Sequence, residues 1–263
     1  MELYETVLYR VENRVAIVTL NRPESRNSLN QKLRLELRHV IEKANADDGV
    51  RAVVINAAGS GFCAGADLTE RLPGAERDGF VTEVLNGEYH PIILGIRKSP
   101  KPYISAVQGA AAGIGSSIAM ACDLMIMADN AFLYSAFGSI SLLPDGGNHK
   151  MLLERLGSKR AFEMIALSQK LDSARCVQLG IANRVVPADA LEAEALRFAE
   201  QVTAAAPLTL RYSKQVLREA ETYDLESVMA LEAEIQNLLF RSRDFREGAQ
   251  AFFEKRQPEF EGR

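Results

Sequence analysis

Two glycine-rich segments decide the fold of this chain: Ala57-Ala58-Gly59-Ser60-Gly61-Phe62-Cys63-Ala64-Gly65-Ala66-Asp67-Leu68 and Gly109-Ala110-Ala111-Ala112-Gly113-Ile114-Gly115. Each follows an apolar run of strand length, which predicts a turn at the end of a strand. The small side chains leave the backbone amides of such turns open. Two open amides that meet one carbonyl oxygen form an oxyanion hole, which stabilises an enolate or a tetrahedral oxyanion.

The residues around these segments predict alternating strands and helices. Apolar runs predict strands at Val15–Leu20, Ala52–Asn56, Tyr103–Val107 and Leu124–Met127, and a spacing of three and four residues predicts helices at Leu29–Ala46 and Ile114–Cys122. This order favours a layered α/β core of the ββα type.

From Ser158 onward the sequence pattern predicts only helices. They lie at Lys159–Leu167, Ser173–Leu179, Ala190–Ala205, Pro207–Glu221 and Leu225–Leu239, separated by Gly, Pro or Asp. We therefore expect an α/β core over residues 1–200 and a helical C-terminal region over residues 201–263.

Composition excludes several classes of function. The chain has 263 residues, of which 47% are hydrophobic, and its net charge of -4 comes from interspersed charges. This favours a globular protein that does not bind nucleic acid. The sequence contains no apolar run of the roughly 20 residues that a membrane span needs, and its start is not that of a secretion signal. We expect a cytoplasmic protein with no membrane partner.

Other site patterns are weak or missing. The three cysteines and three histidines are too scattered for a disulfide framework or a metal site, so buried, unpaired cysteines are expected. Gly113-Ile114-Gly115 begins like a dinucleotide-binding fingerprint, but Ile118 stands where its third glycine belongs. Markers of serine hydrolases and P-loop enzymes do not occur.

Seven motifs in register resemble the crotonase superfamily, also called the enoyl-CoA hydratase/isomerase family. They are Asn21-Arg22-Pro23 with Asn27-Ser28-Leu29, Gly61 to Leu68, Pro100-Lys101-Pro102, Gly113-Ile114-Gly115, Ala121-Cys122-Asp123, Leu143-Pro144-Asp145-Gly146-Gly147 and Ala251 to Arg256. The resemblance implies a crotonase-like fold and an acyl-CoA thioester substrate, with coenzyme A as part of that substrate and no separate cofactor. It also implies that the amides of Ala66 and Ile114 form the oxyanion hole. The predicted helix start at Ile114 supports that role, because a helix N-terminus presents free N–H groups.

Carboxylates decide the reaction within this family, because a separate group must move the proton. Typical hydratases carry two glutamates, and the matching places here hold Ser117 and Phe137. Asp145 matches the aspartate that carries the proton in certain isomerases, although Pro144-Asp145-Gly146 is also an ordinary turn sequence. Dienoyl-CoA isomerases carry extra acidic residues at the places of Ser117 and Phe137, so the single-aspartate isomerases are the closer likeness. Burial among apolar residues, expected to be Phe137, Ile140, Leu142 and Leu143, would raise the pKa of Asp145.

The resemblance also implies how coenzyme A is held. It points to Ser25, Arg26, Ala64, Asp67 and Leu68, and near the C-terminus to Phe252 beside adenine and Lys255 beside phosphate. For Asp67 the alternative is a cap of a following helix. C-terminal contacts in this family often come from a neighbouring subunit, which implies a homotrimer or a dimer of trimers.

The charged stretch Thr69–Tyr89 contains two helix breakers and is expected to form a mobile lid. Candidate lining residues are Phe80, Val84, Leu85 and His90, although a structural role is expected for the histidine.

The leading hypothesis is a Δ3-Δ2-enoyl-CoA isomerase in which Asp145 performs a 1,3-proton shift. Two alternatives stay open, an enoyl-CoA hydratase in which Asp145 works alone and a catalytically silent acyl-CoA-binding paralogue.

Overall fold

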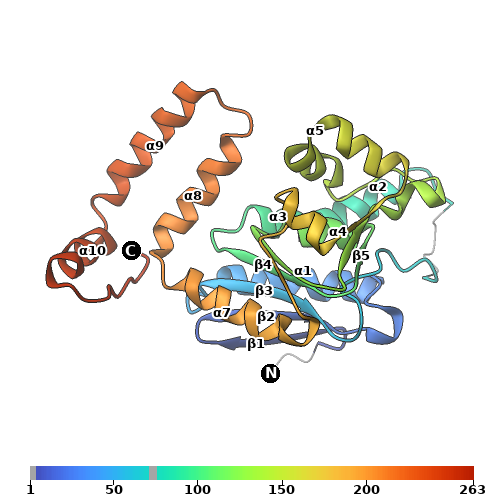
Figure 1. Cartoon of the computed structure of the whole chain (residues 1–263), viewed down its shortest axis with the longest axis horizontal. Helices are drawn as coiled ribbons and strands as arrows, with labels where there is room; N and C mark the ends of the chain where they lie inside the picture. The colour runs from blue at the N-terminus through green and yellow to red at the C-terminus, as the bar shows by residue number, and fades with distance from the viewer. Residues whose placement is uncertain (1–3, 71–75) are drawn as a thin grey trace.

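A six-stranded sheet forms the centre of the protein, whose computed structural model describes residues 4–70 and 76–263. Its strands are β1 (Val7–Glu12), β2 (Val15–Leu20), β3 (Ala52–Ala57), β4 (Tyr103–Val107), β6 (Leu124–Ala128) and β9 (Arg184–Val186), in that spatial order (Figure 1). β1 runs antiparallel to β2, and all other neighbours are parallel.

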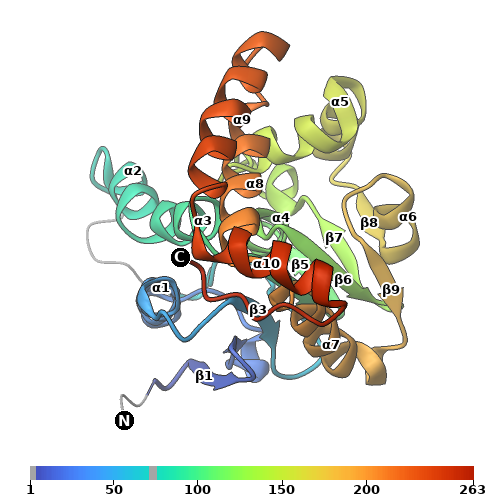
Figure 2. The same cartoon turned by 90° about the vertical axis from the view of Figure 1, so that its left-hand side faces the viewer.

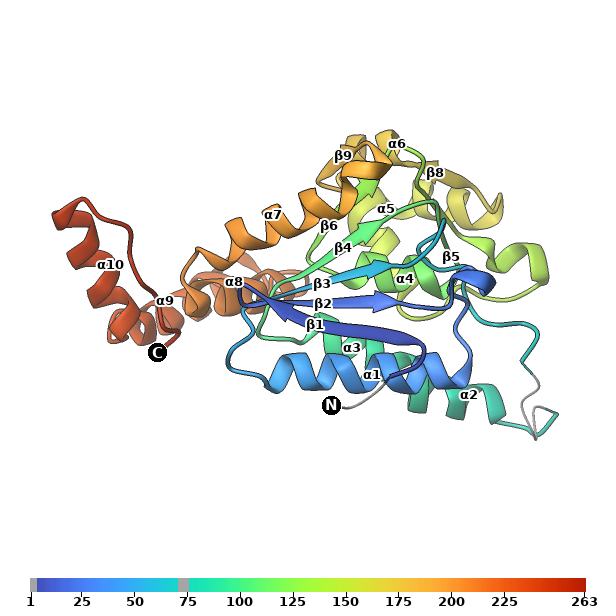
Figure 3. The same ribbon diagram turned by 90° about the horizontal axis from the view of Figure 1, so that it is seen from below.

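Helices cover both faces of this sheet (Figure 3). α1 (Gln31–Ala46), which contacts β1 and β2, lies on one face together with α3 (His90–Arg97). α7 (Leu191–Thr203) packs on the other face, across β2, β3, β4 and β6. Every residue of β2 is consequently buried, as expected for a strand whose sheet is covered by helices on both faces.

A second, smaller sheet leads to the site. β5 (Ala110–Ala112) follows β4 after a short turn and pairs with β7 (Phe132–Tyr134), which pairs with β8 (Lys170–Asp172). α4 (Ile114–Ala121) begins directly after β5, and all its residues are buried. The first turn of α4 is therefore packed within the protein on every face.

The remaining helices lie outside this core. They are α2 (Phe80–Val84), α5 (Asn148–Ala166), α6 (Ser173–Gln178), α8 (Pro207–Glu219), α9 (Leu225–Leu239) and α10 (Arg243–Glu254). α8, α9 and α10 extend to one side of the body in Figure 1 and stand in front of the sheet in Figure 2. Lys214 of α8 holds this extension to the core, because its Nζ donates to the carbonyls of Ile96 and Lys101 and pairs with Asp123.

These layers confirm the predicted α/β class, with corrections to individual elements. α1 begins at Gln31 rather than Leu29, because Leu29 pairs with Ala66 and Asn30 caps the helix through Leu33 N. The helix predicted at Lys159–Leu167 is the second half of α5, which begins at Asn148 and is interrupted at Gly157.

The segment predicted as a lid is helical from Phe80 onward. α2 continues through a π-helical turn, Leu85–Tyr89, into α3. Residues 71–75 of that prediction lie outside the described residues. Within the described ranges no helix has the length and apolar character needed to cross a bilayer.

Candidate active site

The two glycine-rich segments lie against each other. Cys63 pairs with β5, since its N–H donates to Ala110 O at 3.0 Å and its carbonyl accepts from Ala112 N at 2.8 Å. This pairing brings Gly65 to Gly113, and a Cβ on Gly113 would lie 3.8 Å from Gly65 Cα. Both glycines have positive φ, 104° and 53°, which other residues rarely adopt. The backbone conformation therefore favours glycine at both positions.

The amides of Ala66 and Ile114 follow these two glycines. Leu29 frames Ala66, donating from its N–H to Gly65 O at 2.8 Å and accepting from Asp67 N at 3.3 Å. Ile114 is the first residue of α4, where the helix leaves its N–H groups unpaired. Neither amide donates to any residue within the described part of the chain. The structure thus brings two free donors together, and their action on a substrate stays a prediction.

Asp145 lies beside the first turn of α4, which carries the Ile114 amide. The Ser117 hydroxyl on α4 donates to Asp145 O at 3.0 Å. The next residue is so close to α4 that a Cβ on Gly146 would lie 2.2 Å from Ile114 Cδ1. The Asp145 loop therefore packs on the helix turn that carries the Ile114 amide.

The Asp145 carboxyl is buried on one side. Its Oδ1 is inaccessible and receives no hydrogen bond from the described residues. Burial raises the pKa of Asp145, and the nearby His90 opposes that change. Asp145 in turn contributes to the raised pKa of Tyr89, about 12, whose main cause is the burial of the phenol. Tyr89 and His90 are thus the ionisable neighbours of this carboxyl.

The expected apolar surroundings of Asp145 need a correction. Phe137 is buried, and its Cζ lies 3.8 Å from where a Gly113 Cβ would stand. Ile140, Leu142 and Leu143 are exposed. The prediction placed these three around the carboxyl because they are close in sequence, whereas the turn directs their side chains outward. The raised pKa was predicted correctly, but these three residues are not its cause.

Ser117 and Phe137 leave no carboxylate at the two places that the family resemblance marks for glutamates. Ser117 is fully buried, and its hydroxyl accepts from Asn148 Nδ2 at 3.1 Å. Phe137 makes its side of the site apolar. Of these three positions, only that of Asp145 carries a carboxylate.

Buried Arg34 forms ion pairs near both ends of Thr69–Tyr89, the segment predicted as a lid. The side chain is 1% exposed, its Nη1 pairs with Glu70 at 2.8 Å, and its Nε pairs with Glu88 at 2.6 Å. Nη1 also donates to Leu29 O at 2.8 Å and lies 3.3 Å from the Tyr89 hydroxyl. One guanidinium therefore joins this segment to the residue that frames Ala66.

We expect Glu70→Gln to lower the free energy of unfolding by about 1.5 to 3 kcal/mol, the contribution of a hydrogen bond to a charged partner. The matched control is Glu83→Gln, which removes an exposed pair with Arg77 and should leave the free energy of unfolding close to that of the wild type, because solvent screens an exposed ion pair. Urea unfolding of both variants measures the difference. Equal costs would contradict the anchoring role of Arg34.

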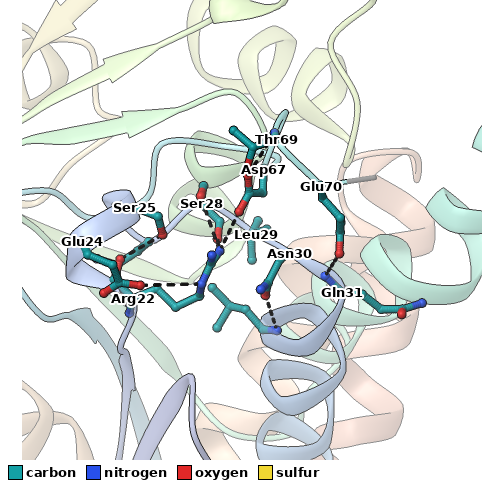
Figure 4. A network of polar contacts seen from close by, with 12 residues as sticks. Arg22, Glu24, Ser25, Ser28, Leu29, Asn30, Gln31, Asp67, Thr69 and Glu70 are labelled. Carbon is teal, nitrogen blue, oxygen red and sulfur yellow. Dashed lines mark hydrogen bonds and ion pairs between the residues drawn. The ribbon is translucent and has the colours of Figure 1, made fainter. Parts of the chain in front are cut away.

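Five of the residues predicted to hold coenzyme A lie in one region. Arg26 O accepts from Ala64 N at 2.9 Å, and the Ser25 hydroxyl donates to Arg22 O at 3.1 Å. The Arg22 guanidinium pairs with Asp67 at 2.9 Å (Figure 4). Leu68 next to it is 74% exposed. These contacts leave Arg26 and Leu68 at the surface.

Asp67 caps a turn rather than a helix. Its Oδ1 accepts from the Thr69 hydroxyl at 2.7 Å and from Thr69 N at 3.1 Å (Figure 4). The Thr69 hydroxyl and the Arg22 ion pair hold the pKa of Asp67 at about 2. The expected helix cap is thus wrong, and the carboxylate is occupied within the chain.

Asp67→Asn should lower the free energy of unfolding by about 1.5 to 3 kcal/mol at pH 7. A depressed folded-state pKa stabilises above the unfolded value of about 3.9, and this stabilisation is lost as pH falls toward the folded value. The difference between variant and wild type should therefore shrink between about pH 4 and pH 2. Urea unfolding across that range tests it. Glu24→Gln, which removes an exposed partner of Arg22, should show no such loss.

Phe252 and Lys255 lie elsewhere. Phe252 is 79% exposed on α10, and Lys255 ends that helix in the left-handed conformation. α10 stands at the far end of the molecule from β5 and α2 (Figures 1 and 3). The structure of one chain does not bring these two residues to the other five.

Sequence reasoning missed Arg34 and Asn148. Arg34 lies on the apolar face of α1 with Leu37 and Ile41, so a charge within an apolar stripe was the available signal. Asn148 follows Gly146-Gly147 without any pattern that marks it. Its role depends on contacts with α4, which is distant in sequence.

The cysteine prediction is confirmed, since Cys63, Cys122 and Cys176 are buried and unpaired. Burial raises the pKa of the Cys63 and Cys176 thiols to about 12. Over residues 4–70 and 76–263 no three His, Cys, Asp or Glu side chains form a group that could hold a metal ion.

Comparisons with known proteins identify the family of this chain. The model of the enoyl-CoA hydratase/isomerase family matches residues 10–263. A probable enoyl-CoA hydratase of Rhodobacter capsulatus is 35% identical over 99% of both chains. The 1,2-epoxyphenylacetyl-CoA isomerase of Escherichia coli K12 is 34% identical over 99% of this chain and 100% of its own.

A solved structure gives the same result for the fold. An enoyl-CoA hydratase from Polaromonas sp. JS666 superposes with a TM-score of 0.90 at 32% identity, covering 97% of this chain and 99% of that one. The crotonase-like fold implied by the seven motifs is confirmed. Because the family model and these relatives span almost the whole sequence, the chain belongs to the enoyl-CoA hydratase/isomerase family of enzymes, the crotonase superfamily.

Proposed function

We propose that the protein is a Δ3-Δ2-enoyl-CoA isomerase with Asp145 as its acid and base. The observation that carries this proposal is the half-buried Asp145 carboxyl beside the start of α4, while Ser117 and Phe137 fill the places of the hydratase glutamates. One carboxylate suffices for a proton shift. Typical hydratases hold the attacking water with two glutamates, and neither of their places carries a carboxylate here.

The reaction follows from the positions of three groups. The Asp145 carboxylate removes a proton from C2 of a 3-enoyl-CoA, and the electron pair moves toward the thioester oxygen. The Ala66 and Ile114 amides hold that oxygen and stabilise the dienolate. The double bond then lies between C2 and C3 once Asp145 returns the proton to C4. The raised pKa of Asp145 makes its carboxylate a stronger base for this step.

We propose that Ser25, Arg26, Ala64, Asp67 and Leu68 form one part of the coenzyme A site. Phe252 and Lys255 would then serve a neighbouring subunit of a homotrimer or a dimer of trimers, because α10 lies far from these five residues (Figure 1). Light scattering gives the subunit number. A monomer that binds acyl-CoA fully would contradict this assignment.

The test of the reaction is a panel of 3-enoyl- and 2-enoyl-CoAs incubated in heavy water. Isomerisation moves the double bond and adds no water. Mass spectrometry with double-bond analysis therefore separates it from hydration. A 3-hydroxyacyl product without isomerisation would contradict the proposal, as would the absence of both reactions and of deuterium exchange at C2 and C4.

The second candidate is hydration of a 2-enoyl-CoA by Asp145 alone. It is favoured by the similarity to the Rhodobacter capsulatus protein, which is named a probable hydratase. A silent acyl-CoA-binding paralogue, in turn, would bind the panel without any exchange.

A further inference from the structure

We propose that Asn148 is a positioning residue that joins the oxyanion hole to Asp145. Its side-chain amide holds the Gly113–Ile114 peptide through Ser116 and the Asp145 backbone through Ser117. This inference rests on the proposed function and deepens it, because it names the connection between the donor and the base.

Asn148 lies at the start of α5 and is 1% exposed. Its Nδ2 donates to the Ser116 and Ser117 hydroxyls, each at 3.1 Å. Ser116 and Ser117 are buried in the first turn of α4. A single amide group therefore connects the starts of two helices.

The first branch of the network ends on the peptide that carries the Ile114 amide. The Ser116 hydroxyl donates to Gly113 O at 2.7 Å. Gly113 C=O and Ile114 N–H belong to one planar peptide group. A hydrogen bond that fixes the oxygen therefore also fixes the direction of the N–H. Hydrogen bonds in series polarise one another, so the same branch strengthens Ile114 as a donor.

The second branch ends on the base. The Ser117 hydroxyl donates to Asp145 O at 3.0 Å, and Asn148 N donates to the same oxygen at 3.1 Å. The Asp145 backbone is thus held by two donors. Since Oδ1 receives no bond from the described residues, hydrogen bonding holds this residue through its backbone carbonyl.

Two single-atom deletions separate the branches, and one truncation removes their shared donor. Ser116→Ala cuts the branch to the oxyanion hole and Ser117→Ala cuts the branch to Asp145. Asn148→Ala removes the amide that donates to both hydroxyls and leaves the serine-to-backbone bonds in place. The matched control is Ser105→Ala, because this buried hydroxyl donates to Ala119 O of the same helix at 3.0 Å and lies outside the network. All four variants lose buried hydrogen bonds, so they share a structural cost.

The first readout is kcat against KM. Each single serine variant of the network should lose about three- to tenfold in kcat with KM unchanged, the effect of one hydrogen bond. Asn148→Ala should lose kcat in the same range, because both hydroxyls lose their shared donor. Adding both serine changes to it should cost less than the sum of the separate losses, because the three residues act in one network. Ser105→Ala should keep the wild-type kcat.

The second readout needs no turnover. Acetyl-CoA labelled at its carbonyl carbon has no double bond to move, and its bound carbonyl stretch in the infrared reports the strength of the oxyanion hole. Ser116→Ala and Asn148→Ala should weaken the wild-type red shift, whereas Ser117→Ala and Ser105→Ala should leave it intact.

The outcomes distinguish this inference from the proposed function. If the network variants match Ser105→Ala in both readouts, the positioning role is wrong even though the wild type isomerises. If the wild type shows no isomerisation but the infrared pattern holds, the reaction assignment fails and the network stands.

Discussion

Asp145→Asn should lower kcat for a 3-enoyl-CoA by about a hundred- to ten-thousandfold, the range for loss of a positioned acid or base. The amide keeps the shape of the carboxyl but accepts no proton from C2. A coupled assay of double-bond position measures the rate. A variant that keeps most of the wild-type rate would remove Asp145 from the mechanism.

Stability supplies the control for this variant. Because burial raises the pKa of Asp145, the folded protein binds that proton more tightly than the unfolded chain, and stability falls as pH rises through the interval between the two pKa values. At pH 7 the charged form is the costly one. Asp145→Asn should therefore unfold at the same urea concentration as the wild type or a higher one. If the urea midpoint of Asp145→Asn were lower than that of the wild type, unfolding would explain its lost rate.

The pH dependence gives a further check on the same residue. In the wild type, kcat/KM should rise with pH through a pKa above the usual aspartate range, because only the carboxylate removes the proton. Asp145→Asn should lack that rise.

Ile114→Pro should lower kcat by about a hundred- to a thousandfold, the loss seen when one oxyanion donor is removed. Proline deletes the N–H without breaking α4, because Ile114 is its first residue and proline is well tolerated there. Steady-state kinetics on the same substrate measures the effect.

Ile114→Ala is the matched control for the loss of the side chain. It removes the contact of Ile114 Cδ1 with the backbone at Gly146 but keeps the amide. We expect it to retain kcat within about tenfold of the wild type, since a shortened side chain only loosens packing. Equal losses in the proline and alanine variants would show that the amide does not act on the substrate.

The elements predicted from sequence are those with a strong local pattern. β2 and β4 match the predicted residues because both are wholly buried and read as continuous apolar runs. β5, β7, β8 and β9 have three residues each, too few to show a period. Their pairing depends on contacts distant in sequence, which one-dimensional patterns do not contain.

The same distinction holds for the site. The small residues of the two segments predicted open backbone amides, and the family resemblance named those of Ala66 and Ile114, whose action on a substrate stays a prediction. The raised pKa of Asp145 was predicted, but three of its expected neighbours, Ile140, Leu142 and Leu143, point outward. Tyr89, which does lie near Asp145, belongs to the π-helical turn before α3. No pattern in the sequence connects that turn with the Asp145 loop.

The central claim is that one carboxyl both removes and returns the migrating proton, and an isotope label tests it most directly. The substrate is a 3-enoyl-CoA with deuterium at C2, turned over in ordinary water and analysed at early times by mass spectrometry and NMR. Because Asp145 is shielded on one side, we predict that part of the deuterium appears at C4 of the 2-enoyl product. A product with no transferred deuterium at any stage of the reaction would contradict a single acid and base.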